Sequence, residues 1–318
     1  MSFWREKRVV VTGGTGFIGS HVVEALQKER CGDILVARHK EYDLSKEEAV
    51  AQLLEQTRPD IVIHLAGLVG GIGANKARPA DFFYQNLTMG TFMLHHSRRL
   101  GVQKFVAAGA GCGYPEHAPM PLKEESFWAG LPQEESAPYS LAKRLLHIQA
   151  IAYFKQYGFP AVIVIPGNVY GPHDNFDLEA SHVVPALVRK FTEAANWGAE
   201  EVTVWGTGRP TRDFVYAGDV ARGIVLAAER YTTTELVNIS SGVETSIREL
   251  TEMIARATGF RGRVVWDTSR PDGQLRRCFD IGKAKADLGF EPHVPLEEGL
   301  RRTVAWFQEN RALARTSV

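Results

Sequence analysis

The sequence predicts an α/β fold in which helices cover both faces of a doubly wound parallel sheet, with a smaller C-terminal α/β domain beside it. In the first half of the chain, apolar runs bounded by turn residues alternate with longer segments of helical periodicity. A glycine-rich turn follows the first of those runs, as it does in Rossmann-type sheets. Beyond about Gly171 the pattern loosens into segments punctuated by proline and glycine, which indicates the second, smaller region.

The predicted strands are short apolar runs with helical segments between them. Parallel neighbours need a crossover connection that is usually a helix, so this alternation favours a parallel sheet. The second half of the chain carries one further strand-like run and a helical pattern near its end. The expected strands are Arg8–Thr12, Ile34–Ala37, Ile61–Leu65, Lys104–Ala108, Ala161–Ile165 and Leu236–Ser240, and the expected last helix is Leu296–Gln308.

The change of pattern divides the chain into two regions. We expect residues 1–170 to form a Rossmann-type dinucleotide-binding domain that is completed by about residues 212–240. Residues 171–211 and 241–318 are expected to form the substrate-binding domain. The sequence shows no internal repeat or linker, so we expect the two regions to pack as one body with the ligand between them, at the carboxyl ends of the strands.

The composition is that of an ordinary globular protein and narrows the classes of partner. Of 318 residues, 44% are hydrophobic and 23% charged, which argues against a disordered or fibrous chain. Lysine plus arginine and aspartate plus glutamate both number 37, so the zero net charge gives no overall attraction to nucleic acid or to a membrane surface. Cys31, Cys112 and Cys278 are too widely spaced for a disulfide framework or a zinc site. Since no signal peptide or membrane span is visible, we expect a cytoplasmic protein. We also expect the protein to hold no metal.

A glycine-rich turn joins the first predicted strand to a helix-like segment at Ser20–Lys28. Residues 13–19 read Gly-Gly-Thr-Gly-Phe-Ile-Gly, which fits G-x-G-x-x-G from Gly14 and G-x-x-G-x-x-G from Gly13. Glycines here allow a sharp turn and let a pyrophosphate approach the backbone at a helix N-terminus, an approach that a side chain at Gly16 would obstruct. The alternative is an ordinary tight turn, but the strand before it and the helix after it favour dinucleotide binding.

The end of the second predicted strand favours NADP over NAD. Residues 37–40 read Ala-Arg-His-Lys, so cations stand where an NAD site usually has an acidic residue for the ribose hydroxyls. Arg38 could pair with a 2′-phosphate through a bidentate contact, although a solvated basic turn is the alternative. Asp43 and Leu44 could flank the adenine ring, but an ordinary turn explains them nearly as well.

A tyrosine and a lysine with helical spacing suggest a catalytic pair. Tyr139 and Lys143 are four residues apart, so on a helix they share one face, and Pro138 suits the start of that helix. A phenol is a poor acid or base near neutrality until an ammonium stabilises its anion. A surface helix pair is the alternative, but the glycine-rich turn earlier in the same predicted sheet favours the catalytic interpretation.

Several motifs resemble those of the extended short-chain dehydrogenases/reductases. They are the glycine turn, the run His-Leu-Ala-Gly at residues 64–67, Asn86, and the Tyr139/Lys143 pair. Within that class the chain resembles the GDP-L-fucose synthases along nearly its whole length. The matching stretches are Val-Gly-Gly-Ile-Gly-Ala-Asn at 69–75, Pro-Ala-Asp-Phe-Phe-Tyr-Gln-Asn at 79–86, Tyr-Gly-Pro-His-Asp-Asn-Phe at 170–176, Ser-His-Val-Val-Pro-Ala-Leu at 181–187, Val-Trp-Gly-Thr-Gly at 204–208 and Arg-Pro-Asp-Gly at 270–273.

The resemblance implies an epimerase/reductase that converts GDP-4-keto-6-deoxy-D-mannose to a GDP-L-fucose-type product. Tyr139 and Lys143 would serve reduction of the C-4 ketone by NADPH, and Cys112 and His182 would be the base and acid that invert C-3 and C-5. The ketone acidifies the protons on both flanking carbons, so one acid/base pair can exchange them through an enolate before reduction. Taken alone, Cys112 could be a core residue and His182 a structural histidine.

The resemblance also implies ligand contacts and a homodimer, which would form through the helices that follow Asp81 and Tyr139. Arg212, with Lys190 or Arg189, is placed to hold the nucleotide diphosphate, or each is a surface cation. The implied cofactor-binding residues are Gly13, Gly16, Phe17, Ile18, Gly19, Arg38, Asp43, Leu44, Leu65, Ala66, Gly67, Lys143, Pro166, Asn168, Val169 and His182. The implied substrate-binding residues are Ala110, Asn168, Lys190, Trp205, Arg212 and Asp272.

Two neighbouring positions depart from the family pattern. Members carry a serine two residues before the cysteine, and the hydroxyl of that serine holds the C-4 oxygen. This chain has Ala110 at that position, and the next residue, where a second hydroxyl is expected, is Gly111. Losing one hydrogen bond to a developing oxyanion costs about 2–4 kcal/mol. Tyr139 could carry the oxygen alone, another group could substitute, or the chain could act only as an epimerase or only as a 4-keto reductase. The last alternative is a catalytically silent NADP- or nucleotide-sugar-binding protein, against which the retained acid and base residues argue.

Overall fold

The structure is a computed structural model that describes residues 3–178, 180–312 and 314. A six-stranded sheet lies at the centre of the larger part of the molecule. Its strands are β1 Arg8–Thr12, β2 Asp33–Ala37, β3 Ile61–His64, β4 Lys104–Ala108, β5 Ala161–Pro166 and β9 Val237–Ile239. They run in the order β2-β1-β3-β4-β5-β9, and every neighbouring pair is parallel. The order reverses between β1 and β3, so the crevice beyond the carboxyl ends of these strands is where such a sheet binds its ligand.

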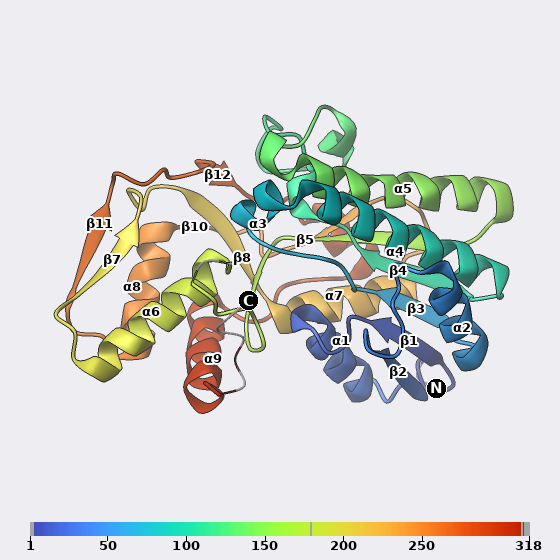
Figure 1. Cartoon of the computed structure of the whole chain (residues 1–318), viewed down its shortest axis with the longest axis horizontal. Coiled ribbons are helices and arrows are strands. Elements are labelled where there is room, and N and C mark those ends of the chain that lie inside the picture. The colour runs from blue at the N-terminus through green and yellow to red at the C-terminus, as the bar shows by residue number, and fades with distance from the viewer. Residues whose placement is uncertain (1–2, 179, 313, 315–318) are drawn as a thin grey trace.

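Helices cover both faces of this sheet. They are α1 Phe17–Lys28, α2 Glu47–Thr57, α3 Ile72–Ala77, α4 Pro79–Arg99, α5 Ala137–Tyr157 and α7 Ala217–Arg230. Along β1, Val9 and Val11 enter the core on one face and Val10 enters the core on the other, as the two-residue period of a strand requires. Helices α1 and α7 complete the first core, and α2, α4 and α5 complete the second (Figure 1). Burial on both faces explains why the strand sequences are continuous apolar runs.

The smaller part of the molecule packs three helices and two strands around a core of its own, at the left of Figure 1. Its elements are α6 Val183–Trp197, β7 Glu201–Trp205, α8 Ile247–Thr258, β11 Arg263–Asp267 and α9 Leu296–Glu309. Strands β7 and β11 are parallel. The apolar sides of the three helices meet at residues such as Phe191, Leu250 and Phe307, all of them buried.

A second sheet connects the two parts. Its strands are β6 Asn168–Tyr170, β8 Thr211–Tyr216, β10 Glu244–Ser246 and β12 Arg276–Arg277. Strand β8 pairs with the other three, parallel to β6 and β12 and antiparallel to β10. Because β6 begins two residues after β5 ends, this sheet lies at the carboxyl edge of the central sheet.

The predicted fold class is confirmed, and every expected strand occurs with ends that differ by at most one residue. Strand β9 lies within the segment 212–240 that was expected to complete the first domain, while the domain division itself stays a prediction. Among the described residues, no helix is long and apolar enough to cross a membrane. In the same part of the chain, no group of three or more side chains could hold a metal ion.

Candidate active site

The turn after β1 is packed so tightly that it leaves no room for a Cβ at two of its glycines, Gly13 and Gly19. Gly13 has φ +70°, and a Cβ on it would lie 2.7 Å from the backbone nitrogen of Ala66. A Cβ on Gly19 would lie 2.0 Å from the carbonyl oxygen of Gly13. Gly16 is the N-cap residue of α1, with Phe17 and Ile18 beginning the helix. The first turn of α1 therefore packs directly on the glycine loop, as a pyrophosphate site requires.

The end of β3 is fixed to the end of β1 beside this turn. Thr12 Oγ1 lies 2.8 Å from His64 Nδ1 and accepts a hydrogen bond from the backbone N–H of Ala66 at 3.3 Å. Burial, and then the nearby charge of Lys143, lower the pKa of His64 to about 3, so its imidazole is neutral. The predicted cofactor residues Leu65, Ala66 and Gly67 follow directly at the edge of the crevice.

The residues directly after β2 are basic, Arg38, His39 and Lys40, and all three are exposed. Arg38 is exposed in the residues directly after β2. Asp43 is held by Ser45, whose backbone N–H and hydroxyl donate to its carboxylate at 3.1 and 2.7 Å and lower its pKa. Leu44 is buried in the core against α2 and α4. Pro166, Asn168 and Val169 lie at the end of β5 and in β6, across the sheet from Arg38.

Tyr139 and Lys143 lie one turn apart near the start of α5. The ammonium of Lys143 donates a hydrogen bond to the carbonyl oxygen of Ala108 at 3.2 Å, which fixes it at the end of β4. A Cβ on Gly67 would lie 3.5 Å from Lys143 Nζ, so the loop after β3 adjoins the ammonium as well. Burial lowers the pKa of Lys143 to about 8, and the charge of Cys112 acts in the opposite direction. Burial, and then the charge of Cys112, raise the pKa of Tyr139.

Asn86 lies on α4 beside the same ammonium. Its amide nitrogen donates to the carbonyl oxygens of Leu68 and Phe82 at 2.9 and 2.8 Å. Its Oδ1 is buried and has no hydrogen-bond partner among the described residues. A Cβ on Gly67 would lie 2.8 Å from this oxygen. The oxygen therefore faces the narrow space that Gly67 and Lys143 also border, where it can accept a hydrogen bond from a ligand or water.

Cys112 lies in the short 3-10 helix Gly111–Gly113 that follows β4. The hydroxyl of Ser140 donates to its carbonyl oxygen at 3.0 Å and to its Sγ at 3.3 Å. On another side, the guanidinium of Arg277 donates to the carbonyl oxygen of Gly111. Cys112 and Arg277 line one cavity of about 250 Å³, with Tyr114, His117, Gln133 and Gln274 among its other walls. Sequence reasoning did not single out Ser140 or Arg277.

His182 is the N-cap residue of α6 in the smaller part of the molecule. Its side chain is exposed, yet protein surrounds it closely enough for desolvation to lower its pKa. The described hydrogen bonds do not join His182 to Cys112. A Cβ on Gly71 would lie 3.6 Å from the carbonyl oxygen of Ala180, so the loop after β3 reaches both the Lys143 ammonium and the segment that carries His182.

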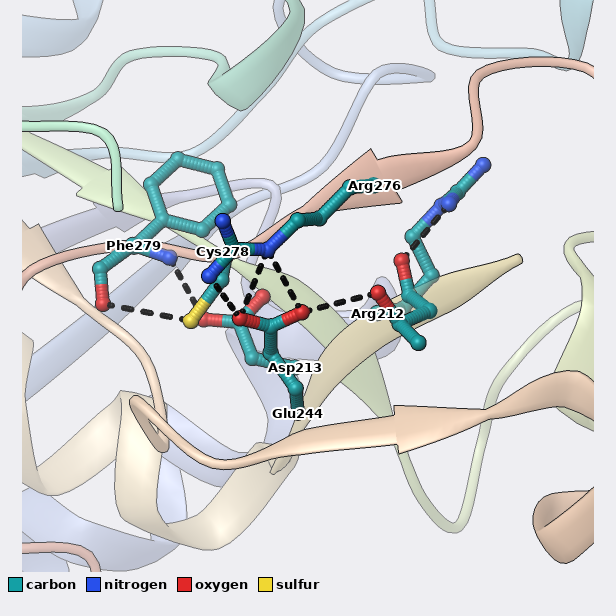
Figure 2. A network of polar contacts seen from close by, with 7 residues as sticks. Arg212, Asp213, Glu244, Arg276, Cys278 and Phe279 are labelled. Carbon is teal, nitrogen blue, oxygen red and sulfur yellow. Dashed lines mark hydrogen bonds and ion pairs between the residues drawn. The ribbon is translucent and has the colours of Figure 1, made fainter. Parts of the chain in front are cut away.

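The pairing of β8 with β12 brings two arginines together. Arg212 and Arg277 are register partners, and burial, then the charge of Arg277, lower the pKa of Arg212 to about 10. Asp213 is fully buried, and its carboxylate accepts hydrogen bonds from Asn168 Nδ2, Ser240 Oγ and the Phe279 N–H at 3.0, 2.7 and 3.0 Å. Burial raises the pKa of Asp213 to about 6 against these hydrogen bonds. Figure 2 shows Asp213 with Phe279 and the neighbouring ion pair of Arg276 with Glu244.

Three of the predicted substrate residues, Lys190, Trp205 and Asp272, lie further out, at the smaller part of the molecule. Trp205 is 58% exposed, and the cations of Lys190 and Arg270 lie 5.2 and 5.1 Å from the centre of its ring. Asp272 accepts hydrogen bonds from the backbone N–H and hydroxyl of Thr207 at 2.6 and 2.7 Å, which lower its pKa. Asp272 thus fastens the loop of Arg270 to the end of β7, where the exposed indole lies between two cations.

The fold and the site together define a dehydrogenase-type enzyme with a dinucleotide crevice, in which a tyrosine, a lysine and a cysteine converge at the end of β4. The model of the NAD dependent epimerase/dehydratase family matches residues 9–240. The chain belongs to that family.

Individual relatives match over nearly the full chain. This chain is 40% identical to GDP-L-fucose synthase 1 of Arabidopsis thaliana, and the alignment covers 96% of this chain and 94% of that protein. A GDP-L-fucose synthetase from Naegleria fowleri bound to NADP superposes with a TM-score of 0.94 at 32% identity, covering 99% of this chain and 97% of the other. A GDP-6-OMe-4-keto-L-xylo-heptose reductase from C. jejuni superposes with a TM-score of 0.89 at 29% identity, covering 97% and 99%.

Proposed function

We propose that this chain is an NADP(H)-dependent epimerase/reductase that converts GDP-4-keto-6-deoxy-D-mannose to GDP-L-fucose. The observation that carries the proposal is the convergence of Cys112 with the Tyr139/Lys143 pair. Cys112 and Tyr139 lie close enough for their charges to interact, and both lie at the carboxyl end of β4. A base for epimerisation and an acid for reduction thus border one site, as two steps on one bound sugar require.

The residues of the crevice fit NADP(H). The backbone around Gly13 and Gly19 leaves no room for side chains at these positions and presents the N-terminus of α1. Arg38 is an exposed cation at the position where a 2′-phosphate would be recognised. When bound, NADPH supplies the hydride. The solved relative that carries NADP covers nearly the whole of this chain.

Epimerisation would proceed by proton exchange on the carbons beside the ketone. The sulfur of Cys112 takes a proton, so a C–H bond breaks, an S–H bond forms, and the electron pair moves into an enolate whose charge rests on the C-4 oxygen. His182 then gives its ring proton to the opposite face of the carbon, which inverts it. The desolvation that lowers the pKa of His182 makes its protonated form a stronger acid.

Reduction follows at C-4 on the side of Tyr139. The phenol delivers its proton to the carbonyl oxygen as hydride reaches the carbon, and the ammonium of Lys143 stabilises the phenolate that remains. Lys143 is held in place for this by its hydrogen bond to Ala108. No hydroxyl is available at Ala110, which is buried, so the phenol of Tyr139 is the donor that this proposal assigns to the C-4 oxygen.

The nucleotide part of the substrate would bind along the connecting sheet and the smaller part of the molecule. Arg212 on β8 is a cation suited to a diphosphate. Trp205 offers an exposed aromatic face for a base or ribose, with Lys190 beside it. These placements make the substrate span both parts of the chain, with its sugar near Cys112.

We also propose that the protein is a homodimer formed through α4 and α5 and that it works in the cytoplasm. These two helices pack together and carry several exposed apolar side chains. They are Tyr84, Leu145, Ile148, Phe154 and Tyr157. The three free cysteines suit a reducing compartment.

The experiment that tests the function follows NADPH oxidation with GDP-4-keto-6-deoxy-D-mannose, comparing the native chain with Ala110→Ser. Stoichiometric oxidation by the native chain, with GDP-L-fucose as product, would establish the proposal. Activity only in the serine variant would mean that the missing hydroxyl has silenced or redirected the site. No oxidation by either protein would exclude this substrate.

One observation favours a second candidate, a 4-keto reductase that does not epimerise. The chain matches the C. jejuni reductase over 97% of its length. Incubation in deuterated water separates the two candidates. An epimerase incorporates deuterium at C-3 and C-5 of the product, whereas a simple reductase leaves both positions unlabelled.

A further inference from the structure

The hydroxyl of Ser140 lies between two acceptors that belong to the same residue. It is 3.0 Å from the carbonyl oxygen of Cys112 and 3.3 Å from its Sγ, and Ser140 is fully buried. A serine hydroxyl has a single proton, so it can donate fully to one acceptor at a time. When Cys112 is a thiol, its S–H can donate to the hydroxyl oxygen of Ser140 while the Ser140 O–H donates to the carbonyl oxygen of Cys112. With Cys112 as a thiolate, O–H can turn to the sulfur.

Arg277 brings a positive charge to the same cysteine from a different element. It lies on β12, donates to the carbonyl oxygen of Gly111 and lines the cavity that Cys112 also lines. None of the carboxylates described in the structure forms an ion pair with it. Burial lowers the pKa of Arg277, and the charge of Cys112 is the largest influence in the other direction. The guanidinium is therefore a desolvated cation that lies beside the cysteine at the wall of the same cavity.

We propose that Ser140 and Arg277 are positioning residues that stabilise the anion Cys112 forms when it loses its proton, Ser140 by a hydrogen bond to the sulfur and Arg277 by its charge. The inference rests on the proposed function, in which Cys112 is the base of epimerisation. A thiol becomes an effective base only when its anion is stabilised by nearby donors or cations. The ammonium of Lys143 also interacts with the charge of Cys112, but it donates to Ala108 and serves Tyr139, so Ser140 and Arg277 are the groups left to act on the cysteine alone.

The test measures how fast iodoacetamide alkylates Cys112 at neutral pH in the full chain without substrate, following the Cys112 peptide by mass spectrometry. The variants are Ser140→Ala and Arg277→Met. Their matched controls are Ser136→Ala, a buried serine whose hydroxyl donates to Gln133, and Arg276→Met, the neighbouring arginine that pairs with Glu244.

We expect each of the two variants to slow alkylation by about three- to tenfold, the scale of one net hydrogen bond or charge contact. The controls should stay within about twofold of the native chain on the same scale. Removing the Ser140 hydroxyl enlarges the space around the sulfur, which by itself would speed alkylation, so a slower reaction reports the state of the sulfur. Unchanged rates in both variants, with melting temperatures equal to that of the native chain, would overturn the proposal.

Conservative variants keep the result interpretable if a substitution disturbs folding. Ser140→Thr retains a hydroxyl and Arg277→Lys retains the charge, so both should alkylate closer to the native rate than Ser140→Ala and Arg277→Met do. Equal slowing in the conservative and the disruptive variants would also overturn the proposal, because it would reflect packing. Slower alkylation in the variants, together with no deuterium exchange into the GDP-sugar by the native chain, would support the positioning roles of Ser140 and Arg277. The same result would show that the proposed function is wrong.

Discussion

The ring of Phe279 fills the space beside Gly111, next to Cys112, since a Cβ built on Gly111 would lie 2.7 Å from Cζ of that ring. The ring has little freedom to move away. Phe279 is buried, and its N–H is held by the carboxylate of Asp213. The phenyl ring therefore occupies the room that a side chain at position 111 would need, while Ala110 next to it already carries a Cβ in a buried position.

This relationship predicts opposite outcomes for two serine substitutions. Gly111→Ser should destabilise the chain by about 1–3 kcal/mol, the usual cost of overpacking a core, and lower its melting temperature. Ala110→Ser adds a single oxygen where the family places one, so it should leave the melting temperature nearly unchanged and raise the rate of NADPH oxidation, by up to about 100-fold. Thermal melts and NADPH oxidation assays check both. A stable Gly111→Ser protein would contradict the structural argument.

Separating the two half-reactions should assign the roles of the three acid and base residues Cys112, His182 and Tyr139. Cys112→Ser and His182→Gln should each slow deuterium exchange at C-3 and C-5 by about 100-fold or more, the usual contribution of a general acid or base. Tyr139→Phe should abolish NADPH oxidation but still exchange deuterium, because the phenol acts in reduction. Nuclear magnetic resonance of the GDP-sugar gives the exchange rates. Loss of exchange in Tyr139→Phe, at an unchanged melting temperature, would show that the two sets of residues are not independent.

The pH dependence of reduction should follow Lys143. Burial lowers its pKa from 10.5 to about 8, so above that pH the ammonium loses its proton and can no longer stabilise the phenolate of Tyr139. We expect kcat for NADPH oxidation to be steady below pH 8 and to fall with a one-proton slope above it. Lys143→Arg keeps its charge in this range, so whatever rate it retains should lack the alkaline fall. A native profile that stays flat to pH 10 would contradict the assignment.

Much of the fold could be predicted because local sequence and burial agree. The strands of the central sheet are buried on both faces, so their apolar runs have visible limits, and the turn at Gly13 and Gly19 is fixed by contacts that admit no side chain. Tyr139 and Lys143 could be paired from spacing alone, because both lie on α5.

The remaining site residues depend on contacts that sequence spacing does not encode. Arg277 reaches Gly111 because the two-residue strand β12 pairs with β8, and a strand that short has no recognisable pattern. Ser140 faces Cys112 across 28 positions of the chain. The sequence does not distinguish Asp213 from any other charged residue in a strand, because the three donors to its carboxylate come from separate segments of the chain.

The choice of cofactor should depend on Arg38. It is exposed just after β2, where a 2′-phosphate would lie, and a charge-assisted contact to that phosphate corresponds to about a 10- to 100-fold effect on binding. Arg38→Gln should therefore raise KM for NADPH by that factor and leave KM for NADH nearly unchanged. Lys40→Gln is the matched control, because it removes another exposed cation two residues further along the same turn. Steady-state kinetics with both cofactors measure the effect. An equal rise in KM for NADPH and for NADH, or an equal effect of Lys40→Gln, would contradict this prediction. It would mean that the overall positive charge of the turn attracts the cofactor and that Arg38 makes no specific contact with the 2′-phosphate.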